Sequence, residues 1–173
     1  MVEKKQVLYD LTTAYKGPFL VEDFYAEIDA WINENGFEKE PKRKSEHVEK
    51  DGKRIELSIE AYRKLDDLHY GVIVLRAQLN NIKDTAIKRD GKKIRINHGE
   101  VFISVDAFIQ SYVHSGFLQA KPVYTFIRAL IDKYVYSFWT DKHDGTVNSA
   151  GKDLFRRIRQ FFEMQGRKYG LDF

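Results

Sequence analysis

The residues with the clearest chemical potential are cations gathered in two short stretches of the chain. Residues 88–95 hold five cations against one acid, and residues 152–168 hold six against two. Lysine and arginine neutralise phosphates, and a guanidinium group can bind one phosphate through two parallel hydrogen bonds. The candidate nucleic-acid ligands are therefore Lys88, Arg89, Lys92, Lys93, Arg95, Arg156, Arg157 and Arg159. Residues 42–44 form a third, smaller basic candidate.

Four aromatic residues add a second kind of nucleic-acid chemistry. Tyr62, Phe102, Phe108 and Tyr112 fall on the predicted polar face of a sheet. An exposed ring on such a face can stack on an unpaired base. The same rings can equally pack beneath a helix, so the sequence leaves both interpretations open. No RNP-type consensus and no GXXG clamp accompanies them.

The five histidines do not form a recognisable metal motif. His69 ends the fragment Asp66-Asp67-Leu68-His69, and His143 lies in Asp141-Lys142-His143-Asp144. Metal sites normally need three or four convergent ligands, and each fragment offers only part of such a set. We therefore predict no metal site and no cofactor, and assign both fragments to solvated or structural roles. Because the chain has no Cys, thiolate ligands, thiolate catalysis and disulfides are excluded.

Signatures of nucleophilic catalysis are also missing. There is no Gly-x-Ser-x-Gly elbow, and residues 148–153 lack the first glycine of a phosphate-binding loop. Glu56, Glu60 and Asp106 lie at polar strand positions, where carboxylates from distant segments can form a catalytic pair. We assign no catalytic residue, leave these three carboxylates open, and favour a protein that is not an enzyme.

The elements that must position these residues are predicted from hydropathy periodicity. Apolar and polar residues alternate strictly through 54–65, 70–80 and 101–113. Side chains change face at every residue of a strand, so this period of two predicts an antiparallel sheet with one buried face. The predicted buried set is Ile55, Leu57, Ile59, Ala61, Ile73, Leu75, Ala77, Leu79, Val101, Ile103, Val105, Ala107 and Ile109.

Weaker patterns complete an α+β fold. Further strands are predicted at 6–15, 45–50, 86–89 and 92–97, with hairpin turns at Asp51-Gly52 and Asp90-Gly91 and a bulge or break at Asn80-Asn81. Helical spacing predicts helices at 18–35, at 122–139 and from 148 onward, with a polar loop at 140–145. The expected fold is an antiparallel sheet of about six or seven strands, with one helix after the first strand and two C-terminal helices packed on one face.

This element order resembles the helix-grip layout of the polyketide-cyclase and START-type lipid-binding superfamily. In that superfamily, a curved sheet wraps a long C-terminal helix around a cavity. The resemblance covers most of the chain but is one of element order, because no sequence motif accompanies it and the second terminal helix departs from the pattern. It implies an apolar small molecule held between the sheet and the helix at 122–139.

Length and composition frame the remaining predictions. A chain of 173 residues fits one domain, residues 1–173, and contains no run of about 18 apolar residues that would span a membrane. The N-terminus lacks the apolar core of a signal peptide. Together with the absence of Cys, this indicates a cytoplasmic protein.

Three hypotheses for function follow. The first is a non-enzymatic protein that contacts RNA or a ribonucleoprotein, such as the ribosome, through its basic patches. The second is a helix-grip-like protein that binds an apolar small molecule. The third is a self-associating homodimer that joins the helix at 18–35, part of a segment with seven acids and one lysine, to a basic patch. The sequence favours the first, because catalytic motifs are absent and aromatic residues reach 14%.

Overall fold

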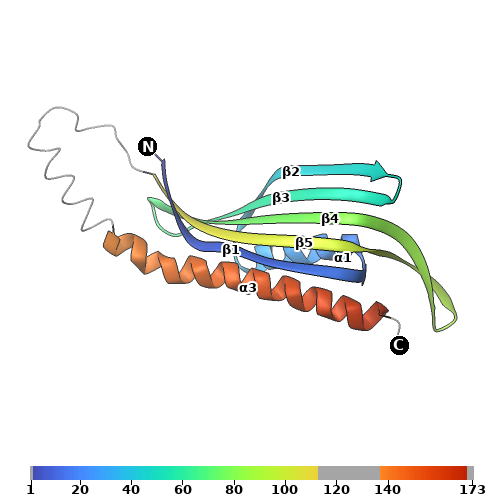
Figure 1. Ribbon diagram of the computed structural model, residues 1–173. Coiled ribbons are helices and arrows are strands. Elements are labelled where there is room, and N and C mark those ends of the chain that lie inside the picture. The colour runs from blue at the N-terminus through green and yellow to red at the C-terminus, as the bar shows by residue number, and fades with distance from the viewer. Residues whose placement is uncertain (1, 113–136, 171–173) are drawn as a thin grey trace, which may run out of the picture.

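The protein folds around one antiparallel sheet. The structure is a computed structural model that describes residues 2–112 and 137–170 and contains, in these ranges, five strands and two helices (Figure 1). The elements are β1 (Val2–Phe19), α1 (Val21–Glu34), β2 (Glu38–Glu49), β3 (Gly52–Lys64), β4 (His69–Arg89), β5 (Lys92–Tyr112) and α3 (Ser137–Tyr169). The strand order is β1-β5-β4-β3-β2, so β1 and β2 form the edges. The predicted α+β class is confirmed.

The described sheet has fewer strands than predicted because two predicted breaks, one in β4 and one in β5, are bridged by continuous pairing. The segments 70–80 and 86–89 both belong to β4, which crosses a register shift between Asn80 and Lys83. Asn81 takes a left-handed φ of 53° at this point. A bulge of this kind lets the extra residue leave the ladder while the strand continues.

A second predicted gap closes in the same way. The segments 92–97 and 101–113 join in β5, which runs without interruption to Tyr112. Gly99 in this stretch pairs with Gly17 of β1. β1 runs from Val2 to Phe19 and so extends at both ends beyond the strand predicted at 6–15.

Both predicted hairpins are present. Asp90 and Gly91 have φ values of 51° and 75°, the left-handed pair that a type I′ turn requires. The turn between β2 and β3 is formed by Lys50 and Asp51, one residue before the predicted Asp51-Gly52, because Gly52 already pairs with Glu49 in the sheet. Pro41, which has no N–H to donate, lies at a register shift of the edge strand β2, where sheets tolerate proline.

The predicted dry face of the sheet is the core. Every residue of the predicted buried set is buried. α1 and α3 pack on this face and contribute Phe24, Ile28, Trp31, Leu154, Ile158 and Phe161 to the same cluster. Truncating a core side chain of this kind to Ala costs about 2–5 kcal/mol. Because both described helices pack on this face, the polar residues of the strands lie on the opposite face of the sheet.

The C-terminal part corrects one prediction. Residues 140–145 belong to α3 instead of forming a polar loop. Asp144 in this segment binds Lys5 of β1, with Oδ2 and Nζ 2.7 Å apart, and Val147 in the next turn is buried in the core cluster; tertiary packing of this kind overrides weak helix propensity. The helix predicted at 122–139 lies, up to residue 136, outside the described residues. Neither described helix has the length and apolar content needed to cross a membrane.

Candidate nucleic-acid interface

The predicted basic hairpin is an exposed projection of the sheet. It extends past the ends of the other strands (Figure 1). Its exposed cations are Lys88, Arg89, Lys92, Lys93 and Arg95. Arg89 Nη1 donates a hydrogen bond to the backbone oxygen of Lys168, 2.6 Å away in the last turn of α3. The tip therefore lies beside two further exposed cations, Arg167 and Lys168.

The three candidate arginines of α3 differ in their availability. Arg157 Nε lies 2.5 Å from Glu27 Oε1, and Arg157 Nη1 binds Glu34 on the same helix, α1. The hydrogen bonds to Glu34 and Glu27 raise the pKa of Arg157. The guanidinium group therefore stays charged, and the two carboxylates balance its charge. Arg156 and Arg159 are both exposed, and Arg156 pairs with Asp153 one turn away in α3. Two acids of α1 thus form ion pairs with Arg157 of α3 in the same chain.

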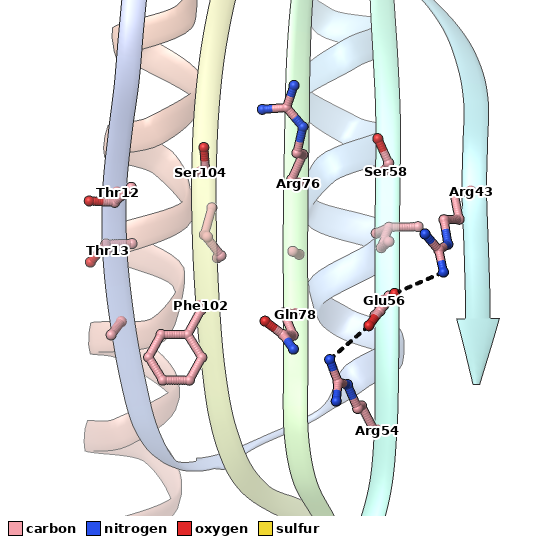
Figure 2. A pocket seen from close by; sticks show the side chains of 14 residues that line it. Thr12, Thr13, Arg43, Arg54, Glu56, Ser58, Arg76, Gln78, Phe102 and Ser104 are labelled. Carbon is pink, nitrogen blue, oxygen red and sulfur yellow. Dashed lines mark hydrogen bonds and ion pairs between the residues drawn. The ribbon is translucent and has the colours of Figure 1, made fainter. Parts of the chain in front are cut away.

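A groove on the other face of the sheet brings together cations that are far apart in the sequence. We call this the open face; it lies opposite α1 and α3, which are seen behind the strands in Figure 2. The groove has a volume of about 790 Å³ and takes residues from all five strands. Its principal lining side chains are Arg43, Arg54, Arg76, Glu56, Gln78 and Phe102.

The strand register explains why the groove is polar. Thr12 pairs with Ser104, and Ser104 pairs with Arg76. Arg76 in turn pairs with Ser58, and Ser58 with Arg43. Residues directly opposite each other in neighbouring strands point to the same face. These five side chains therefore form one polar row across the whole sheet, with a guanidinium group in the middle and another at its end.

Three arginines and one carboxylate, Glu56, line the groove. The two oxygens of Glu56 are shared: Arg54 Nη2 lies 2.9 Å from one and Arg43 Nη2 lies 3.3 Å from the other. Arg76 Nη1 lies 2.6 Å from Asp106 Oδ2, yet the side chain of Arg76 is 55% exposed. Its remaining N–H groups are available to an anionic ligand.

Asp106 anchors Arg76 from within the sheet. The Asp106 side chain is buried, and its Oδ1 accepts hydrogen bonds from Gln6 Nε2 at 3.0 Å and from the backbone N–H of Asp10 at 2.8 Å. Asp10 has a φ of 37° at an irregularity in the β1–β5 pairing, and its carboxylate accepts from Ser104 Oγ. This network fixes the carboxylate and thereby orients the guanidinium group of Arg76.

Phe102 is the predicted stacking residue that lies in the groove. It is 47% exposed, whereas Tyr112 is 40% exposed and packs against the ring of Tyr70 at a centroid distance of 5.5 Å. Tyr62 and Phe108 are half-buried. Phe102 therefore offers the most accessible of the four rings.

The three carboxylates that the sequence left open each contact a cation. Glu56 and Asp106 hold the arginines of the groove, as described above. Glu60 Oε2 lies 3.6 Å from Lys42 Nζ and accepts a hydrogen bond from the Tyr62 hydroxyl. Burial, together with that hydrogen bond, raises the pKa of Tyr62 to about 12, so the phenol stays protonated near neutral pH. These contacts give the carboxylates a positioning role.

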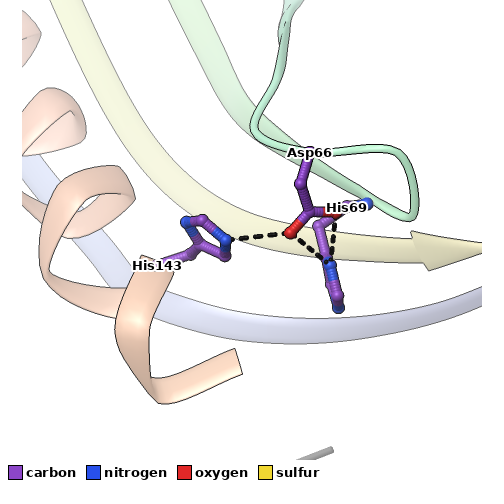
Figure 3. A group of neighbouring side chains, drawn as sticks. All are labelled: Asp66, His69 and His143. Carbon is purple, nitrogen blue, oxygen red and sulfur yellow. Dashed lines mark hydrogen bonds and ion pairs between the residues drawn. The ribbon is translucent and has the colours of Figure 1, made fainter. Parts of the chain in front are cut away.

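A second group of polar side chains forms where the sequence showed only fragments. Asp66 and His69 flank the β3–β4 connection, and His143 comes from α3 (Figure 3). His69 Nδ1 lies 2.8 Å from Asp66 Oδ1, and His143 Nε2 lies 3.0 Å from Asp66 Oδ2. The fold thus joins the two fragments that each offered part of a metal-ligand set.

Comparison with known proteins adds no identity: no protein-family model matches the chain, and no curated protein matches it. Function is therefore inferred from the geometry and charge of the open face.

Arg54 and Arg76 were missed by the sequence-based prediction because each stands apart from the basic runs. The one signal for them was their place at polar positions of alternating strands, on the same face as Phe102.

Proposed function

We propose that this protein binds single-stranded RNA, free or within a ribonucleoprotein such as the ribosome, on the open face of its sheet. It does so as a cytoplasmic binding protein without catalysing a reaction. The observation that carries this proposal is the groove of about 790 Å³ in which Arg43, Arg54 and Arg76 line the same surface as the exposed ring of Phe102.

Single-stranded RNA presents the groups that this groove can bind. Guanidinium groups bind phosphates, and an exposed ring stacks on a base whatever its identity. The side chains of Gln78, Ser58 and Ser104 supply hydrogen bonds for base edges and 2′-hydroxyl groups. In a common RNA-binding module, a four-stranded sheet stacks about two or three bases on its aromatic residues. The open face offers a similar platform with one ring in place of several.

The basic hairpin adds a second cationic surface, beside the last turn of α3. Lys88, Lys92, Lys93 and Arg95 are exposed, and no acid among the described residues forms an ion pair with them. Cations of this kind bind the backbone of RNA without regard to sequence, because phosphate neutralisation releases counterions. We assign to the hairpin a sequence-independent contribution to affinity, and to the groove the contacts with bases.

The helix-grip alternative places its ligand beside the helix predicted at 122–139, which lies, up to residue 136, outside the described residues, so that site stays a prediction; the layer beneath α3 gives it little support. Between the sheet and α3, the described residues leave a pocket of about 220 Å³ beside Tyr15, Val101 and Phe162. Small-molecule sites usually have volumes of roughly 300–1,000 Å³. Most of the layer between sheet and helices is occupied by the core cluster. An apolar ligand there would have to displace packed side chains.

The self-association alternative also has less support. The edge strand β2 is almost fully exposed and rich in Lys, Arg and Glu, with Pro41 among them. Charged edges with proline are typical of strands that avoid pairing with another chain. The acids Glu27 and Glu34 of α1, moreover, already bind Arg157 of the same chain.

Replacing Phe102 with Ala tests the proposal. We expect the affinity for a short labelled oligouridine at low salt to fall about 5- to 150-fold, because one stacked base contributes about 1–3 kcal/mol. Fluorescence anisotropy measures the change, and circular dichroism checks that the variant is folded. The matched control is Tyr9→Ala, which removes a ring that is 69% exposed on β1 outside the groove and should leave the affinity unchanged.

Two results would contradict the proposal. One is the absence of RNA binding by the unaltered protein at low salt. The other is an equal loss of affinity in Phe102→Ala and Tyr9→Ala, which would mean that the groove is not the binding surface.

A further inference from the structure

The Asp66, His69 and His143 cluster has the composition and spacing of a divalent-metal site. Asp66 Oδ2 lies 2.9 Å from His69 Nδ1 and 3.0 Å from His143 Nε2, and the ligand atoms of all three side chains fall within 4.8 Å of one another (Figure 3). Metal–ligand bonds of about 2.0–2.1 Å in a tetrahedral site place neighbouring donor atoms about 3.3 Å apart. Small side-chain movements would therefore open the cluster around an ion.

The carboxylate of Asp66 is held in the orientation that such a site needs. Its Oδ1 accepts hydrogen bonds from the backbone N–H groups of Leu68, at 2.8 Å, and of His69, at 2.9 Å. The carboxylate is therefore fixed through Oδ1 and directed with Oδ2 toward both imidazoles.

The position of the cluster gives an ion there a structural consequence. Asp66 and His69 belong to the β3–β4 connection and the start of β4, whereas His143 belongs to the first turns of α3. Nearby, Asn148 Nδ2 donates to the backbone oxygen of Val7, 2.7 Å away, and a Cβ placed on Gly71 would lie 3.0 Å from Val147 Cγ2. This is the junction at which α3 begins to pack on the sheet.

We propose that Asp66 Oδ2, His69 Nδ1 and His143 Nε2 bind one divalent transition-metal ion, with Zn²⁺ as the best match, and that the ion fastens the start of α3 to the β3–β4 connection. Two imidazoles and one carboxylate are a common ligand set for Zn²⁺, with water in the fourth position. A neutral imidazole presents a lone pair at either nitrogen once its proton is on the other one. Binding therefore needs a change of tautomer at each histidine, together with the small side-chain movements that open the cluster.

The test is a titration of the full chain, purified without a histidine tag and freed of metal by a chelator, with Zn²⁺ alone. Isothermal titration calorimetry should show one ion per chain, and the melting temperature should rise as Zn²⁺ is added. Co²⁺ in place of Zn²⁺ should give the visible absorption of a tetrahedral N/O site. Asp66→Asn should weaken Zn²⁺ binding by more than about 100-fold, which is the upper end of the cost of losing a residue that only orients a ligand.

Asp66→Asn is chosen because its amide oxygen can still accept the two backbone hydrogen bonds, so the connection should keep its shape. His143→Ala removes a second ligand and should show the same loss, with an unchanged circular dichroism spectrum. His47→Ala, which removes an exposed histidine of β2, is the control and should bind Zn²⁺ like the unaltered protein. Failure of the unaltered protein to bind Zn²⁺, or binding that survives in Asp66→Asn, would overturn the proposal and leave a hydrogen-bonded tether only. Loss of the ion in His47→Ala would also overturn it, because it would place the ion elsewhere.

Discussion

At the residue scale, two carboxylates hold α1 against α3. Asp153 Oδ2 accepts a hydrogen bond from the indole N–H of Trp31 at 2.8 Å, and Glu34 binds Arg157. Trp31 is fully buried, so its N–H has no water as an alternative partner. The hydrogen bond from Trp31 lowers the pKa of Asp153 below its ordinary value of 3.8, and the hydrogen bond from Arg157 lowers that of Glu34 below 4.5.

These two lowered pKa values predict an acid-sensitive contact. Below pH values near 4.5 and 3.8, the unfolded chain takes up protons on Glu34 and Asp153 before the folded chain does. The stability that these groups contribute is therefore present above the ordinary pKa values and is lost as the pH falls through the folded ones. We expect the free energy of unfolding, measured with urea, to decrease in this window.

The control is the double variant Glu34→Gln and Asp153→Asn, in which neither group can titrate. Its free energy of unfolding should depend less steeply on pH in the same window, while the amide oxygen introduced at position 153 can still accept the hydrogen bond from Trp31. An equally steep dependence in the variant would show that other carboxylates account for the acid sensitivity.

At the scale of elements, two glycines test the corrected boundary of α3. Gly145 lies inside α3, where a Cβ would meet no atom within 4 Å. Gly145→Ala should therefore stabilise the protein by about 0.5–1 kcal/mol, the cost of glycine in a helix interior. Chemical denaturation measures the change. No gain, or a loss, would mean that residues 140–145 are not helical.

Gly36 is the matched control for this substitution. A Cβ at Gly36 also meets nothing within 4 Å, but the residue ends α1 with a left-handed φ of 67°. Gly36→Ala should therefore destabilise the protein by about 1–2 kcal/mol through backbone strain alone. The two variants make the same chemical change in equally open space, so their opposite signs would isolate backbone conformation.

The strands show what local periodicity predicts and what it misses. Alternation assigned the buried face of β3, β4 and β5 correctly, because successive side chains of a strand point to opposite faces of the sheet. It divided β4 at Asn80, because the bulge there shifts the pattern by one residue while the backbone pairing continues on both sides. Pairing across strands cannot be inferred from one strand's own pattern.

The same limit explains how much of each candidate site was predicted. The hairpin cations were found because they are contiguous and flank an Asp-Gly turn. The groove arginines were not grouped, because Arg43, Arg54 and Arg76 meet only through the register of three strands. Asp66 and His143 are 77 residues apart, and only the packing of α3 on the sheet unites them.

At the scale of the whole molecule, the net charge of +3 comes with charges that are segregated along the chain. α1 and α3 cover one face of the sheet, where Arg157 pairs with acids of α1 while Arg159, Arg167 and Lys168 of α3 are exposed. The open face retains the arginine-lined groove, and the β4–β5 hairpin projects beyond it.

This arrangement predicts how RNA binding depends on salt. Each phosphate neutralised on single-stranded RNA contributes about −0.7 to the slope of log K against log salt concentration. Replacing Lys92, Lys93 and Arg95 together with Ala should make the slope shallower by up to about 2, and fluorescence anisotropy at several salt concentrations measures it. The domain should stay folded, because exposed charges on a turn contribute little to stability.

The comparison variant is Arg156→Ala with Arg159→Ala, which removes cations from α3 instead of from the hairpin. Because α3 packs on the side of the sheet away from the groove, and Arg156 pairs with Asp153, we expect a smaller change in slope than in the hairpin variant. Equal changes would show that the RNA also contacts α3, as the sequence alone predicted. An unchanged slope in both variants, with binding intact, would confine the phosphate contacts to the groove arginines and remove the hairpin from the proposed interface.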